Sequence, residues 1–87
     1  MKNLDECRIE LNSIDDKMKE LFILRMKTIK DVALYKKENG LAIFDEKREA
    51  LMKNRLSSDV NEVKDEYLEF LDCILKVSKD YQNKIIG

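Results

Sequence analysis

The chain has 87 residues, no proline, no histidine and a formal net charge of −1, although 40% of its residues are charged. This length suits one small domain, which buries only about 60% of its unfolded surface and usually needs disulfides, a metal or oligomerisation for stability. The near-neutral charge argues against nucleic acid or a membrane surface as the main partner. Without histidine, the chain cannot be a hydrolase with a histidine base or hold a histidine-ligated metal.

The two cysteines, Cys7 and Cys73, lack metal-ligand spacing and cannot form a disulfide framework, so we expect both to be small buried hydrophobic residues. No apolar run approaches the roughly 20 residues that cross a bilayer, and the N-terminal stretch has no apolar core typical of a secretory signal. We therefore expect a cytoplasmic protein that gains its missing stability by oligomerisation.

A first helix is expected over about residues 4–39, where residues at steps of three and four form a sustained heptad seam. Such a helix would be about 50 Å long, which is more than the width of an 87-residue globule. Part of it must pack outside its own chain, and the same helix of a second copy is the simplest partner. The seam positions are Leu4, Cys7, Leu11, Ile14, Met18, Leu21, Arg25, Thr28, Val32, Tyr35 and Asn39.

Two further helices are expected, at about residues 45–56 and 61–85. Gly40 can adopt the left-handed conformation that closes the first helix, and Asp45 can cap the N-terminus of the second. The polar break at residues 57–59 separates the second helix from the third, which has a long apolar stripe. The sequence therefore predicts an all-α fold, with residues 1–87 as a single domain of three helices that associates as a homodimer.

Three basic residues of the first helix stand out. Arg25 interrupts the apolar seam, so it either forms a structural ion pair with another helix or faces a cavity and binds an anion. Lys36 lies eleven residues on, close to three turns, so it projects from nearly the same side about 16 Å away. Arg8 lies about 25 Å before Arg25 and a quarter turn round, so it is either a solvated surface residue or joins the other two from an antiparallel partner helix.

Polar residues in the other two helices have both ordinary and functional interpretations. Arg48 and Glu49 follow Asp45 and fit a normal amphipathic charge pattern. Ser78 and Gln82 are four residues apart and share one helix face, either as the polar edge of a core or as part of a site. Because the chain has no catalytic triad, zinc-ligand cluster or glycine-rich phosphate loop, an enzyme built from it must act through cations, hydrogen-bond donors and shape.

In order and spacing, these residues resemble the motif of the all-helical chorismate mutases, over about Leu4 to Ile85. Members of that family have Arg, Arg, Lys, an Asp-x-x-Arg-Glu run and a Ser-x-x-x-Gln pair at similar intervals. The resemblance implies an isomerase that converts chorismate to prephenate in phenylalanine and tyrosine biosynthesis, without cofactor or metal. It also implies an intertwined homodimer with two equivalent sites. The matching residues are Arg8, Arg25, Lys36, Asp45, Arg48, Glu49, Ser78 and Gln82.

The resemblance implies a role in substrate binding or catalysis for each matching residue. Arg8 of one chain and Arg25 of the other would bind the two carboxylates of chorismate, with help from Ser78. Lys36 and Gln82 would donate hydrogen bonds to the ether oxygen, whose negative charge grows as its bond to carbon breaks.

The remaining motif residues would act at the ring hydroxyl of the substrate. Glu49 would hold the ring hydroxyl, assisted by the backbone near Asp45, and Arg48 would orient Glu49. Two other functions fit the same sequence: an isochorismate–pyruvate lyase of the same fold, or a non-catalytic helical dimerisation module. The presence of both Glu49 and Gln82 favours the mutase over the lyase.

Overall fold

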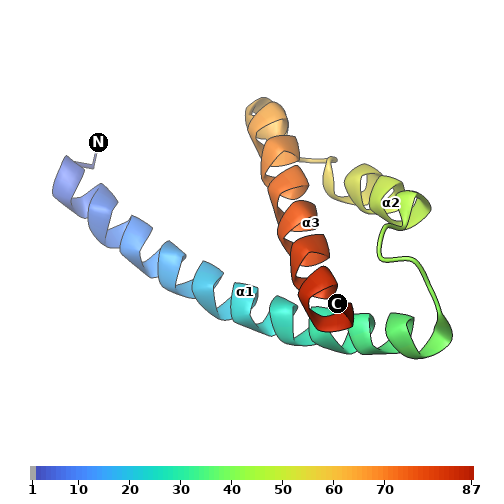
Figure 1. Cartoon of the computed structure of the whole chain (residues 1–87). Coiled ribbons are helices and arrows are strands. Elements are labelled where there is room, and N and C mark those ends of the chain that lie inside the picture. The colour runs from blue at the N-terminus through green and yellow to red at the C-terminus, as the bar shows by residue number, and fades with distance from the viewer. Residues whose placement is uncertain (1) are drawn as a thin grey trace.

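A computed structural model describes residues 2–87 and contains three α-helices, one short 3₁₀ turn and no strand in that range (Figure 1). The elements are α1 (Leu4–Asn39), α2 (Glu46–Leu56), η1 (Asn61–Val63) and α3 (Lys64–Ile86). The all-α class predicted from the sequence is therefore confirmed. None of the helices in residues 2–87 is both long enough and apolar enough to span a membrane.

Helix α1 is long because both of its ends are capped and no proline interrupts it. The Asn3 side chain accepts a hydrogen bond from the Glu6 backbone N–H at 2.9 Å, which satisfies one free donor of the first turn. At the other end Gly40 has a φ of 63°, a left-handed conformation that glycine adopts without steric cost. The 36 residues correspond to about 54 Å, which matches the 54 Å long dimension of the molecule.

Helix α3 packs against the C-terminal part of α1, whereas the N-terminal part of α1 projects away from the other helices (Figure 1). The buried stripe of α3 contains Leu71, Leu75, Ser78 and Gln82, at the spacing of one helix face. Its first two members form the hydrophobic core together with Met52 of α2. Its last two members are polar although each is only 4% exposed. The apolar core is therefore small, and the buried residues farther along α3 are polar.

The part of the predicted seam after Arg25 is wrong by about one residue. Ala33 is fully buried and Ile29 and Lys36 are half-buried. Of the predicted seam residues, Val32 is also half-buried, whereas Thr28 and Tyr35 are exposed. The cause is that a straight α-helix drifts by about 20° per heptad relative to a strict seven-residue repeat. Over the four heptads that follow Leu4, this drift shifts the helix face that points toward the core by nearly one residue along the sequence.

The connection between α1 and α2 folds back across the end of α1. The Lys36 ammonium group donates a hydrogen bond to the Ile43 carbonyl oxygen at 2.7 Å, which ties the connection to the helix. Asp45 then caps α2, because its side chain accepts a hydrogen bond from the Arg48 backbone N–H at 3.0 Å. These two contacts place the first turn of α2 opposite the polar half of α3.

The chain enters α3 differently from the prediction, which placed the start of a regular helix at residue 61. Residues 61–63 form a 3₁₀ turn, and α3 begins at Lys64. Asp59 and Asn61 have positive φ values of 61° and 54°. Such values do not continue an α-helix, and Asp and Asn tolerate them better than most residues do.

The face of α1 that continues past α3 leaves apolar side chains uncovered. Leu4, Leu11, Ile14, Met18 and Leu21 of the predicted seam are all exposed. Beside them, a groove of about 660 Å³ runs between α1 and α3. Its lining is almost entirely apolar and consists of Met18, Lys19, Leu21, Phe22, Arg25, Met26, Phe70, Cys73, Ile74 and Val77.

The expectation that both cysteines are buried is wrong for the single chain. Cys73 is exposed in this groove, and Cys7 is half-buried on the projecting part of α1. Both cysteines lie beside apolar side chains that are themselves exposed.

Candidate active site

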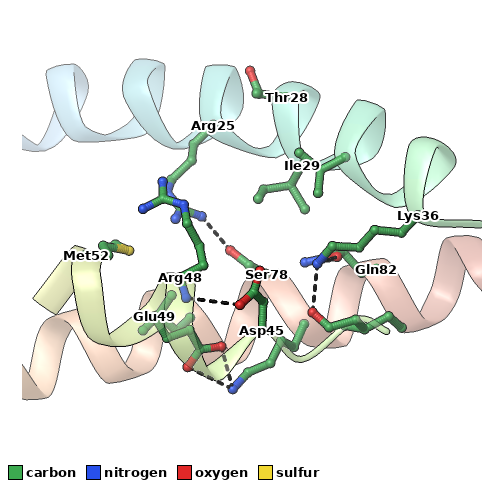
Figure 2. A pocket seen from close by; sticks show the side chains of 14 residues that line it. Arg25, Thr28, Ile29, Lys36, Asp45, Arg48, Glu49, Met52, Ser78 and Gln82 are labelled. Carbon is green, nitrogen blue, oxygen red and sulfur yellow. Dashed lines mark hydrogen bonds and ion pairs between the residues drawn. The ribbon is translucent and has the colours of Figure 1, made fainter. Parts of the chain in front are cut away.

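A cavity of about 310 Å³ lies between α1, α2 and α3, where the apolar core ends. Seven of the eight residues singled out in the sequence line it, contributed by all three helices and the N-cap of α2 (Figure 2). The seven are Arg25, Lys36, Asp45, Arg48, Glu49, Ser78 and Gln82.

Arg8 is the predicted site residue that does not reach this cavity. It is exposed on the projecting part of α1, and it does not line the cavity. Arg25 and Lys36, by contrast, both point from α1 toward α3 (Figure 2). This agrees with their spacing of almost three helical turns.

Arg25 forms its polar contact with a neutral partner. Its guanidinium group donates a hydrogen bond to Ser78 Oγ at 2.5 Å, and no carboxylate in residues 2–87 lies within ion-pair distance of it. Burial, and secondly the positive charge of Arg48, lower the pKa of Arg25 below its ordinary value. The structural ion pair considered for Arg25 is therefore absent from the described residues, and an uncompensated cation faces the cavity.

Lys36 and Gln82 form a second polar contact between α1 and α3. Lys36 Nζ donates to Gln82 Oε1 at 3.0 Å and to the Ile43 carbonyl oxygen at 2.7 Å, so one ammonium donor remains (Figure 2). Because the Gln82 carbonyl oxygen accepts from Lys36, the two N–H groups of its amide remain free to donate. The pair thus offers donors from two directions at one end of the cavity.

Lys79 is a cavity residue that sequence reasoning missed. Its Nζ lies 3.1 Å from Glu49 Oε2 and 3.4 Å from Glu49 Oε1. Arg48, expected to orient Glu49, forms no ion pair with it in the described residues. No periodicity relates Lys79 to Glu49, because they lie on different helices, so only the packing of α2 on α3 reveals the pair.

The charges around the cavity favour an anionic ligand. Four cationic side chains and two carboxylates line it, which gives an excess of two positive charges within one chain. The cations are Arg25, Lys36, Arg48 and Lys79, and the carboxylates are Asp45 and Glu49. The apolar lining comes from Ile29, Val32, Ile43, Met52 and Leu75, which motif spacing alone did not identify.

A family model for chorismate mutase type II matches residues 7–83 of this chain, which include every site residue named above. The chain belongs to the type II chorismate mutases. No curated protein and no solved structure matches it. Family membership supports chorismate mutase activity in general, and it accounts for a cavity that combines an excess of cations with neutral hydrogen-bond donors.

The cation excess predicts that Arg48→Gln raises the thermal unfolding midpoint of this type II chorismate mutase without ligand. Arg48 has an unfavourable position, because its charge lowers the pKa of Arg25 and because it lies in the first turn of α2, where the helix dipole disfavours cations. The expected gain is at most about 1 kcal/mol, measured by thermal unfolding at low salt, and it should shrink in high salt.

The matched control for this prediction is Arg55→Gln. Arg55 is in the last turn of the same helix, where the dipole favours a cation, and it does not line the cavity. Its substitution should leave the midpoint unchanged or lower it slightly. A midpoint for Arg48→Gln that falls below that of the wild type would contradict the idea that repulsion between the cavity's cations lowers the stability of the protein.

Proposed function

We propose that this protein is an isomerase that converts chorismate to prephenate in phenylalanine and tyrosine biosynthesis. The single observation that supports this most is the cavity itself, where Arg25 with Ser78 and Lys36 with Gln82 lie at two ends of one pocket (Figure 2). The cytoplasmic location expected from the sequence belongs to this proposal.

The proposed reaction breaks a C–O bond and forms a C–C bond within one molecule, with no proton transfer. It therefore needs no acid, base, nucleophile or cofactor. The enzyme must hold the enolpyruvyl side chain over the ring, and restricting two carboxylates does this at a low entropic cost. It must also stabilise the growing negative charge on the ether oxygen with donors that are already in place.

We assign carboxylate binding to Arg25 and to Arg8 of a second copy. The planar guanidinium group suits two-point contact with a carboxylate, and Ser78 already fixes one edge of Arg25. Burial and the nearby charge of Arg48 lower the pKa of Arg25, which means that both disfavour its cation. An anionic substrate would offset both effects.

Stabilisation of the ether oxygen belongs to Lys36 and Gln82 in this proposal. Lys36 has one ammonium donor left after its bonds to Ile43 and Gln82, and the Gln82 amide has its N–H groups left. Since these contacts are made between groups of the protein itself, the donors need little reorganisation when the bond breaks.

The ring hydroxyl is assigned to Glu49, with help from the backbone next to Asp45. Both residues come from the first turn of α2 and its cap, and both line the cavity. Arg48 adds positive potential here rather than a direct contact to Glu49.

We further propose an intertwined homodimer in which each site receives Arg8 from the partner. The projecting, apolar part of α1 and the groove of about 660 Å³ beside it offer complementary surfaces for a second copy. Arg25 lines both this groove and the cavity. A partner helix that lies in this groove would therefore reach the edge of the cavity, next to Arg25.

The direct test of this proposal is an assay of chorismate loss with identification of the product. Prephenate should form from chorismate, and isochorismate should release little or no pyruvate. Preferential release of pyruvate from isochorismate would establish the lyase instead. A protein that acts on neither substrate, and whose melting temperature chorismate does not raise, would be a non-catalytic dimerisation module.

Gln82→Glu should make activity depend on pH, whereas wild-type activity should stay nearly constant across the neutral range because an amide does not titrate. At neutral pH the introduced carboxylate would be ionised and accept from Lys36, so it could not donate to the ether oxygen. We expect kcat to fall about 10²–10³-fold at neutral pH and to recover as pH falls toward the glutamate pKa of about 4.3. Profiles of kcat and of kcat/KM against pH measure this, and a wild-type profile that drops steeply near neutrality would contradict it.

A shared site predicts complementation between two inactive variants, Arg8→Ala and Arg25→Ala. Unfolding and refolding equal amounts together makes half of the dimers mixed, and each mixed dimer has one intact site. The mixture should regain about a quarter of wild-type activity, whereas each variant refolded alone should stay inactive. Inactivity of mixed dimers that have been verified by mass would show that Arg8 does not act across the interface.

A further inference from the structure

The pair between Lys79 and Glu49 differs from the other ion pairs in residues 2–87. The two side chains are only 31% and 18% exposed, which makes this pair the least exposed of the four. Lys79 Nζ contacts both oxygens of the carboxylate, at 3.1 and 3.4 Å. Partial burial strengthens such a contact, because solvent screens the two charges less.

Lys79 is also held from a second side. Its Nζ lies 4.8 Å from the centroid of the Phe44 ring, a distance at which a cation is attracted to the ring face. Phe44 directly precedes the cap residue Asp45, so Lys79 links α3 to the segment that leads into α2. Two contacts on one ammonium group fix its position better than a single surface ion pair would.

We propose that Lys79 is a positioning residue that holds the Glu49 carboxylate ready to accept a hydrogen bond from the ring hydroxyl of the substrate. This inference rests on the function proposed above. An ionised carboxylate can accept about four hydrogen bonds, so contact with Lys79 leaves lone pairs for a ligand. Without Lys79, Glu49 would be free to turn toward the cation of Arg48 or Arg25, both of which line the same cavity.

Kinetics of Lys79→Met test the proposal. The hydroxyl contact exists in both the bound substrate and the transition state, so KM should rise about tenfold while kcat changes less than about twofold. Lys79→Arg should keep KM near the wild-type value, because a guanidinium group can also pair with both carboxylate oxygens. An unchanged KM for Lys79→Met, or no rescue by Lys79→Arg, would overturn the inference. If Lys79→Met fails to fold, Lys79→Gln takes its place with the same expectations.

Lys76→Met is the matched control. Lys76 lies on the same helix and pairs with Asp80 at 2.8 Å, but it does not line the cavity. This substitution removes the same charge, so it should leave both kinetic constants unchanged. A rise in KM equal to that of Lys79→Met would show an effect of net charge on a dianionic substrate and overturn the inference.

A second arm separates positioning from direct attraction of the substrate. In the Glu49→Gln background, Lys79→Met should cause no further rise in KM, because Lys79 acts through the missing carboxylate. A further tenfold rise would show that Lys79 binds the substrate itself. If the wild type does not convert chorismate, the proposed function fails and this inference fails with it. If the wild type is active but the Lys79 variants behave as it does, only the inference fails.

Discussion

The buried face of α3 changes from apolar to polar midway along the helix, and the cavity lies where this change occurs. Up to Leu75 the buried stripe fills the space between helices with hydrocarbon. Beyond it, Ser78 and Gln82 occupy the same stripe and receive hydrogen bonds from Arg25 and Lys36. A buried polar group costs stability unless it is paired, so the contacts among these four side chains allow Ser78 and Gln82 to be buried.

This arrangement limits how stable one chain can be by itself. Within residues 2–87, only four hydrophobic residues are buried, three of them in one cluster with a few partly buried neighbours, and the polar end adds repulsion between cations. Meanwhile a long apolar face of α1 and an apolar groove remain uncovered. Burial of such surface is the main favourable term in association, so a second copy would supply what the single core lacks.

The sequence predicted those features of the site that depend on periodicity within one helix. Arg25 and Lys36 share a side because eleven residues are close to three turns, and Ser78 and Gln82 share a face because they are four apart. Contacts between helices were not predictable in this way. The pairing of Lys79 with Glu49 depends on how α2 packs on α3. The buried face of α1 follows the 3.6-residue helix rather than the seven-residue repeat that the sequence displays.

Arg25 connects the proposed chemistry to the proposed dimer, because it lines both the cavity and the groove. Its cation lies at the end of the cavity farthest from Lys36 along α1, which is the end that opens toward uncovered apolar surface. In the proposed dimer the second carboxylate of a dianionic ligand there would be bound by Arg8 of the other copy, because Arg8 of the same chain lies about 25 Å away along the helix. In the proposed dimer, one chain alone would lack a second carboxylate-binding cation on the same side on which it lacks a cover for its apolar face. One antiparallel helix from another copy would remedy both deficiencies, since the apolar seam and Arg8 lie on the same projecting segment.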